Sequence, residues 1–263
     1  MLVAGIILSL VAIALFVISR VMAGKAVSIA GTEKTTASAI RAEAKGVADE
    51  IGGGSFSKYA ELSGTIKCAT PLDAELSGTK CVHYETKVVR EYEETYVERN
   101  NDGSSQTRTR RGTENVSLNS RSCVFSLDDG SGELEVDPAG AEFHLDTTMS
   151  KFQPGEDGFS IGTFVLNNII AGTGGRRTIG YRLEEKSLPV ERLGYVFGEV
   201  GDTGGALRIG KSGEHNRRLI ISIKSEKELI RSAKTGALWL TISSCAALAA
   251  GIAMFVLIIM KKA

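Results

Sequence analysis

The sequence has 263 residues, with 31 basic and 31 acidic side chains and a formal net charge of zero. This balance excludes the long-range attraction to nucleic acid that a strongly basic chain exerts, so we expect no nucleic-acid partner. The length allows one large domain or two small ones.

Both ends of the sequence carry long, uncharged apolar segments. A helix needs about 17–25 mainly apolar residues to cross a bilayer, so we predict transmembrane helices at residues 2–23 and 237–260. The first segment could instead be a cleaved signal peptide, but no basic residue precedes it and residues 21–24 are a poor cleavage site. Trp239 and Lys261 flank the second segment as interfacial residues do. The prediction is a two-pass integral membrane protein whose first partner is the lipid bilayer.

Residues 32–52 are rich in Ala, Glu and Lys and predict a juxtamembrane helix. Ile40, Ala44, Val47 and Ile51 recur at helical spacing and form one narrow apolar stripe. A run of three glycines then ends the helix. The stripe either packs on the protein's own domain or binds a partner or a bilayer surface.

Two β-hairpins are predicted in the first half of the middle region. The first pairs residues 77–99 with a returning strand across an Asn-Asp-Gly turn, and the second folds residues 124–127 onto residues 133–136. The first strand is acidic at residues 91–98 and the returning strand is basic at residues 108–121. This pattern predicts cross-strand ion pairs on a solvated face.

Residues 146–180 are Gly- and Thr-rich without periodicity, and we interpret them as an irregular connection. A helix is predicted at residues 225–236, with Ser225 as its N-cap. Between these segments lies a turn at residues 201–204 within a second run of strands, at residues 178–188, 192–200, 206–209 and 219–224. The predicted fold is a mainly β (β-rich α+β) domain at residues 55–224 between two transmembrane helices, as one unit or as two small barrel-like halves.

Several of these segments together resemble one family. The two main ones are residues 77–84 (Ser-Gly-Thr-Lys-Cys-Val-His-Tyr) and residues 125–141, which contain Asp-Asp-Gly-Ser-Gly-Glu-Leu-Glu-Val-Asp-Pro. Further matching segments lie at residues 64–66, 71–72, 181–189, 195–200 and 219–228. In this order they resemble the GIDE (beside-a-membrane, BAM) domain of the mitochondrial and chloroplast outer-membrane RING E3 ubiquitin ligases. The chain looks like a RING-less, prokaryotic-type member, which implies a plasma-membrane location.

The family's ligase activity requires a RING, in which Cys-x-x-Cys steps and a His hold two zinc ions. The sequence has four scattered cysteines, no Cys-x-x-Cys, and only three residues after the second predicted span. We therefore expect no metal, no cofactor and no zinc-dependent ligase activity. Cys81 and Cys123 could pair in an oxidising compartment, or all the cysteines could be small buried hydrophobes.

Other motifs are weaker. Residues 205–212 (Gly-Ala-Leu-Arg-Ile-Gly-Lys-Ser) match the phosphate-loop pattern, but they look like a strand with no helix after them. Residues 172–177 predict a flexible loop, and residues 128–132 predict a hairpin turn because they lack the ligand spacing of a calcium loop. The three histidines have no nucleophile signature beside them; they are His83, His144 and His215. We assign no catalytic, cofactor-binding or metal-binding residue.

Small residues recur at four-residue spacing in both predicted spans, at Gly5 and Ser9 and at Ser243, Ala247 and Gly251. Such faces allow helices to approach closely in lipid. The two spans therefore pack on each other or mediate a homo-oligomer.

The function that fits these features best is a non-enzymatic interaction or scaffold module with an unknown protein partner. The alternatives are ligase-type activity, as the family name implies, and an oligomeric membrane pore. The membrane side of the middle region stays open. Lys and Arg at the inner ends of the spans favour the cytoplasm, whereas the resemblance implies the compartment that corresponds to an intermembrane space.

Overall fold

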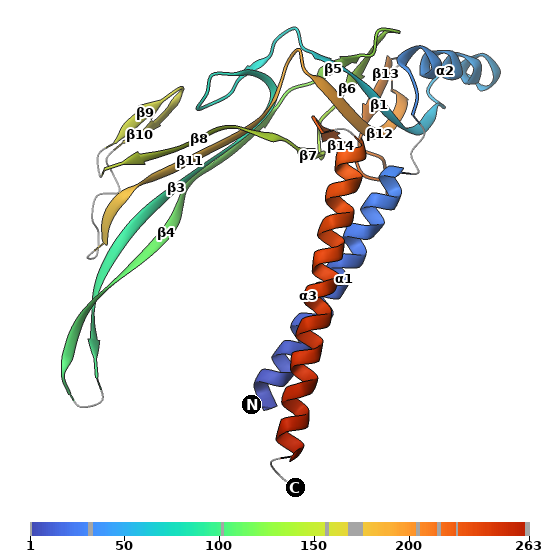
Figure 1. The fold of residues 1–263 in the computed structure, drawn as a ribbon. Coiled ribbons are helices and arrows are strands. Elements are labelled where there is room, and N and C mark those ends of the chain that lie inside the picture. Colours follow the sequence, from blue (N-terminus) through green and yellow to red (C-terminus); the bar gives the residue numbers. More distant parts are fainter. Residues whose placement is uncertain are drawn as a thin grey trace. The chain divides into compact units, whose positions relative to one another are not determined.

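The computed structural model forms two compact units, Met1–Glu33 with Lys224–Ala263 and Lys34–Ile223 (Figure 1). The residues described are 2–30, 34–100, 103–155, 158–167, 176–203, 206–214, 217–224 and 226–260.

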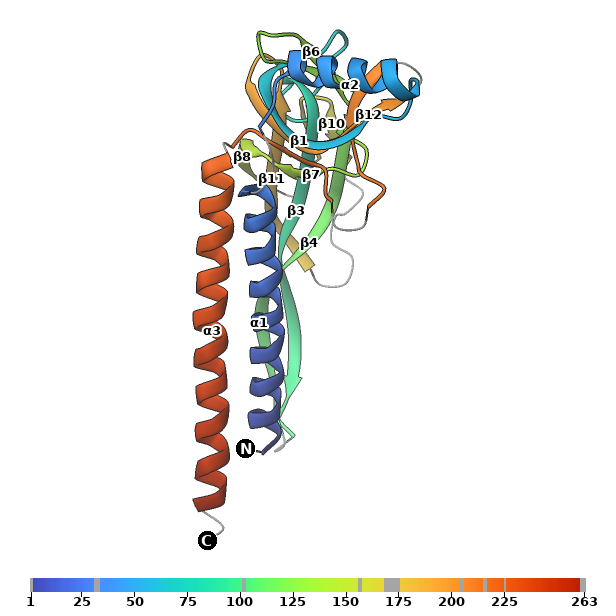
Figure 2. The same cartoon turned by 90° about the vertical axis from the view of Figure 1, so that its right-hand side faces the viewer.

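The first unit is a pair of helices, α1 (Leu2–Ala30) and α3 (Glu226–Met260), which lie side by side (Figure 2). The Ser244 hydroxyl donates a hydrogen bond of 2.9 Å to the Ala12 carbonyl across their contact. The buried residues at this contact are small; they are Ala12, Ser19, Ala237, Ser244 and Gly251. The two helices therefore pack on each other within one chain, and Ser244 rather than the predicted Ser243 faces the contact.

One helix in the described residues is long and apolar enough to cross a membrane, at Ile230–Val256 within α3. The apolar part of α1, Ile6–Val21, is shorter. The helix predicted at residues 225–236 and the span predicted at residues 237–260 lie in one uninterrupted helix, α3. The predicted N-cap, Ser225, lies outside the described residues.

The second unit contains a closed barrel of five strands. They are β1 (Ser57–Lys67), β5 (Phe125–Asp128), β6 (Glu133–Val136), β12 (Leu193–Thr203) and β13 (Ala206–Gly210). The ring runs β1-β5-β6-β13-β12 and closes where β12 pairs with β1, and all its pairs are antiparallel except β6 with β13. If the five barrel strands are numbered in chain order, the ring runs 1-2-3-5-4, and strands 3 and 5 are parallel. This is the topology of an OB-fold barrel. The topology alone indicates no ligand.

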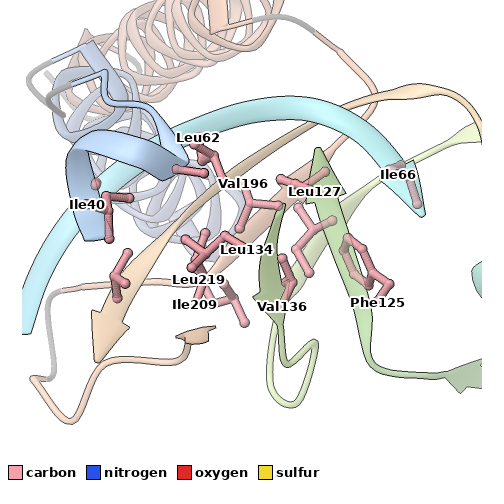
Figure 3. Close-up of a cluster of buried hydrophobic side chains, with 14 of the residues drawn as sticks. Ile40, Leu62, Ile66, Phe125, Leu127, Leu134, Val136, Val196, Ile209 and Leu219 are labelled. Carbon is pink, nitrogen blue, oxygen red and sulfur yellow. The ribbon is translucent and has the colours of Figure 1, made fainter. Parts of the chain in front are cut away.

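Helix α2 (Ala37–Ile51) packs on the barrel. The Thr36 hydroxyl accepts a hydrogen bond from the Ala39 N–H and caps the helix, and Gly52 ends it with φ of 91°. Ile40 is fully buried among barrel side chains, as Figure 3 shows, and Ala44 joins the same cluster. The interpretation that this stripe packs on its own domain is confirmed; Ile51, the last predicted member, is exposed.

The other large sheet is built from two insertions into the barrel. Strands β2 (Leu72–Asp73), β3 (Lys80–Arg99) and β4 (Ser105–Ser122) lie between β1 and β5 in the sequence, and β8 (Asp146–Pro154) and β11 (Arg176–Pro189) lie between β6 and β12. They form the antiparallel order β4-β3-β11-β8, with β2 on β3 (Figure 1). Both predicted hairpins, β3–β4 and β5–β6, are confirmed.

The interpretation of residues 146–180 as an irregular connection is wrong. This segment contains β8, the start of β11 and a small hairpin, β9 (Phe159–Ile161) with β10 (Phe164–Leu166). This β9–β10 hairpin places aromatic rings on the β4-β3-β11-β8 sheet. The ring centroids of Phe159 and Tyr181 are 5.2 Å apart. The sequence of β8 has no regular alternation of polar and apolar residues, and its pairing with β11 supplies the order that local sequence does not.

Two short strands complete the unit. β14 (Ile220–Ser222) pairs with β12, and β7 (Glu142–His144) pairs in parallel with β14. The turn predicted at residues 201–204 is displaced, because β12 continues to Thr203 and pairs with Ala206 of β13. Gly204 lies outside the described residues.

Candidate interaction surface

The β3–β4 hairpin is the longest element of the second unit, and we call it the arm. β11 accompanies β3 only as far as the pair Arg176–Glu94, so the arm continues to the pair Arg99–Ser105 as two strands within the described residues. β4 pairs with β3 alone among the described strands, so its other edge is open. An open strand edge presents unpaired backbone N–H and C=O groups that can pair with another extended chain.

A ladder of charges crosses the arm. Glu93 accepts hydrogen bonds from Arg111 of β4 at 3.1 Å and from Arg177 of β11 at 3.0 Å. Glu94 lies between Arg110 and Arg176 in the same way, at 2.7 and 3.1 Å. The predicted cross-strand ion pairs are confirmed, but each glutamate is shared by two arginines.

These hydrogen bonds favour the charged forms of the glutamates. The bonds from Arg177 and then Arg111 lower the pKa of Glu93, and those from Arg110 and then Arg176 lower the pKa of Glu94. The Arg110 guanidinium lies 5.4 Å from the centre of the Tyr96 ring, which helps to hold it in place. Glu93, Glu94 and their arginine partners are therefore all charged at neutral pH.

The outer strand of the ladder is strongly basic. β4 carries four arginines and one glutamate, whereas β3 carries five glutamates. The side chains of Arg108, Arg110 and Arg111 are 56, 64 and 77 % exposed. Each arginine forms an ion pair with a glutamate of β3. No described strand lies at the open edge to provide a second acidic partner. A further strand with acidic side chains would continue the alternation of charge.

β4 also carries features that limit nonspecific pairing. Val88 pairs with Ser117 and Val89 with Asn115, so Val116 is an extra residue that forms a β-bulge. Two copies of β4 placed edge to edge would bring arginines close together, which is unfavourable. The edge therefore disfavours pairing with a second copy of β4.

The other motifs lack reactive geometry in the described residues. Ala206–Gly210 of the phosphate-loop pattern is strand β13, and no helix begins at residues 211–214, so the interpretation of this segment as strand and turn is confirmed. Of residues 172–177, only the last two are described, and both belong to β11. Across the described chain, no group of three or more His, Cys, Asp or Glu side chains could hold a metal ion.

The turn at residues 128–132 is a hairpin turn, as predicted, and has a structural role that the sequence did not reveal. Asp129 accepts a hydrogen bond of 2.8 Å from the Ala37 N–H at the start of α2, and the Ser131 hydroxyl accepts another from Ser38. An acidic side chain at a helix N-terminus satisfies free N–H groups and suits the helix dipole. The turn thus holds α2 against the barrel.

His83 is buried and packed. Its ring stacks on Phe143 at 3.5 Å between centroids, and its Nδ1 lies 2.7 Å from the Ser122 hydroxyl. Nε2 lies 3.5 Å from a Glu85 carboxylate oxygen. Burial lowers the pKa of His83, and the hydrogen bond and charge of Glu85 oppose this only in part. His144 is half-buried beside Glu142, and His215 lies outside the described residues.

We expect acid to destabilise the second unit through His83. The unfolded chain takes up a proton near the ordinary pKa of 6.5, while the folded unit resists it, so stability falls as pH drops below 6.5 and is unaffected by this group above it. The slope is at most about 1.4 kcal/mol per pH unit. Urea unfolding at pH values above and below 6.5 measures this dependence of the unfolding free energy on pH. His83→Gln should remove this part of the slope and His144→Gln should keep it; equal slopes in all three proteins would contradict the assignment.

All four cysteines are free thiols in the structure, and the sulfur next to that of Cys123 belongs to Cys68 rather than to Cys81. Cys81 is fully buried, and burial, followed by the charge of Glu185, raises its pKa to about 12. Cys123 lies beside Cys68 instead, with their sulfurs 3.8 Å apart. Cys68 and Cys123 are half-buried free thiols, and Cys245 is exposed on α3.

Comparison with known families matches residues 93–257 to the GIDE model, described as an E3 ubiquitin ligase. The match runs from the arm through the barrel strands β5, β6, β12 and β13 and into α3. The chain belongs to the GIDE family. Searches of curated proteins and of solved structures gave no significant match. The GIDE assignment therefore agrees with the family predicted from the sequence.

Proposed function

We propose that this GIDE-family chain is a membrane-anchored, non-enzymatic interaction module whose arm binds an acidic, extended segment of a partner protein along β4. The observation that carries the proposal is the exposed arginine row on an open strand edge. Main-chain hydrogen bonds to the edge would provide affinity, and glutamates or aspartates opposite Arg108, Arg110 and Arg111 would provide specificity.

We also propose that both apolar helices, α1 and α3, span a prokaryotic plasma membrane. α1 exposes a nearly continuous apolar surface, including Leu10, Ile13 and Val17, which is unfavourable in water. Hydroxyls in both helices have backbone acceptors, as lipid requires; Ser19 donates to Phe16 and Thr241 to Ala237. Cysteines introduced at Gly103 and after α3 test whether both helices span the membrane. If they do, a membrane-impermeant reagent added to intact cells should label one of the two cysteines and not the other.

Two other functions are less well supported. The family description is E3 ubiquitin ligase, but these 263 residues contain four cysteines and no Cys-x-x-Cys step, so they lack RING zinc ligands. Zinc in the purified chain, or binding of a ubiquitin-conjugating enzyme, would support ligase-type activity. A homo-oligomer or pore would need a helix face for assembly, and the small-residue contact is already used between α1 and α3.

Peptide binding to the full chain in detergent tests the proposed partner. The probe is a fluorescent peptide of alternating Glu and Val, compared with a Lys-for-Glu version and with an acidic peptide interrupted by prolines. We expect only the first to bind well. Replacing Arg108, Arg110 and Arg111 together by Gln should weaken it by at least about tenfold.

The matched control is Arg182→Gln, which removes an exposed arginine of the same sheet that pairs with Glu91 on β3 and lies away from the open edge. It should leave peptide affinity unchanged. Equal binding of the proline-interrupted peptide would show that charge alone acts and would overturn strand addition. Binding to anionic lipid vesicles without peptide binding would replace the proposed protein partner by a membrane surface.

A further inference from the structure

Cys68 and Cys123 occupy special places in the chain. Cys68 is the first residue after β1, and Cys123 lies between β4 and β5. They are therefore the two ends of the insertion that carries β2, β3 and β4, and 55 positions separate them. Any bond between them would close the base of the arm on the barrel.

The two thiols are already close. Their sulfurs are 3.8 Å apart, compared with about 2.05 Å in a disulfide. The Cys68 thiol donates to the Val124 carbonyl and the Cys123 thiol to the Val82 carbonyl, each at 3.6 Å. These contacts hold both side chains at the junction of β1, β3 and β5.

Access and reactivity also distinguish this pair. Both residues are half-buried, so a small oxidant reaches them, whereas Cys81 is fully buried. Burial, and then the adjacent Cys68 thiol, raises the pKa of Cys123 to about 11. The thiolate is the reactive form, so the pair should resist air at neutral pH and react with a disulfide oxidant or at higher pH.

We propose that Cys68 and Cys123 form a disulfide in an oxidising environment, which locks the base of the arm to the barrel. With oxidised glutathione, the thiolate that reacts first attacks one glutathione sulfur and releases one glutathione thiolate. The second protein thiolate then attacks the mixed disulfide and releases the other glutathione. The protein loses two protons and two electrons, and one oxidised glutathione becomes two reduced molecules. This inference is independent of the proposed acidic partner.

The test uses the full chain in detergent, incubated with oxidised glutathione and then denatured and labelled with a maleimide polymer that counts free thiols. Untreated protein should show all four thiols, and oxidised protein should show two fewer. Mass mapping without reduction should find the peptide of Cys68 joined to that of Cys123, and a reductant should reverse it. This mapping needs no variant, so a folding defect cannot obscure it.

Variants sharpen the result. Cys81→Ala should form the same cross-link, while Cys68→Ala and Cys123→Ala should each keep all three remaining thiols free of intramolecular cross-links. Protection of β3 and β4 amides from hydrogen exchange should rise near the base of the arm after oxidation of the wild type only. A cross-link that includes Cys81 or Cys245, or stable glutathione adducts without a cross-link, would overturn the proposal.

Discussion

Gly64→Ala is expected to destabilise the barrel by about 3 kcal/mol, at the upper end of the usual cost of overpacking. A Cβ atom at Gly64 would lie 2.6 Å from the carbonyl oxygen of Asp128 and 2.7 Å from its carbonyl carbon, both backbone atoms of β5. Backbone held in a ladder cannot rotate away as a side chain does. For a unit of this size, the loss corresponds to a fall in melting temperature of roughly 6–12 °C.

The reason for the glycine lies in the path of β1. This strand pairs with β12 along Ser57–Thr65 and with β5 along Thr65–Lys67, so Gly64 immediately precedes the residue at which β1 begins to pair with β5, and its backbone lies close to that of Asp128. Glycine permits such close approach. Gly194, the residue paired with Gly64 on β12, also lacks room for a side chain, because a Cβ there would lie 2.9 Å from Ile66.

Thermal unfolding and hydrogen exchange of the full chain in detergent measure this effect. The control is Gly210→Ala, since a Cβ at this β13 position meets no atom within 4 Å. It should leave the melting temperature nearly unchanged. Similar losses in both variants would mean that glycine content in general, rather than the contact with Asp128, limits stability.

Local patterns predicted the hairpins well because each depends on nearby residues. The acidic first strand and the basic return strand lie close together in sequence, and the structure pairs them as expected. The stripe of Ile40 and Ala44 likewise predicted a packed helix. In each case short-range periodicity and turn chemistry carry enough information.

The barrel depends on contacts that no local pattern contains. Its closure requires β12 to pair with β1 and β13 to run parallel to β6, across insertions that separate these strands in sequence. The same holds for the candidate surface. The sequence predicted Glu93 and Glu94 opposite arginines of β4, but Arg176 and Arg177 join them only because β11 lies on the other side of β3.

Sequence reasoning missed the proximity of Cys68 and Cys123 for the same reason. Cys81 and Cys123 lie near each other in a hairpin diagram, but the end of β1 brings Cys68 to the β4–β5 junction and into contact with Cys123. The signal that could have identified this pair is positional, since the two residues flank one insertion. Recognising it requires the order of strands in the barrel.

Among substitutions in the β4-β3-β11-β8 sheet, Glu185→Ala is expected to reduce stability the most. The Glu185 side chain on β11 is fully buried, and its carboxylate accepts hydrogen bonds from the backbone N–H of Leu76 at 2.6 Å and of Ser77 at 3.2 Å. Alanine would leave both N–H groups without this acceptor, and each buried group that loses its partner costs about 1–3 kcal/mol. The expected loss is therefore about 3 kcal/mol or more, with early hydrogen exchange at Leu76 and Ser77.

Glu184→Ala is the matched control, because Glu184 is the adjacent residue, points to the opposite face and is only half-buried. It should change stability little, and Glu185→Gln should fall between the two because its amide oxygen still accepts one of the hydrogen bonds. Leu76 belongs to the core that Phe164 and Leu183 complete, so release of its backbone should loosen the sheet that supports the arm. If Glu185→Ala and Glu184→Ala unfolded alike, the β2–β3 loop would be held by its apolar contacts, and the buried carboxylate would need another explanation.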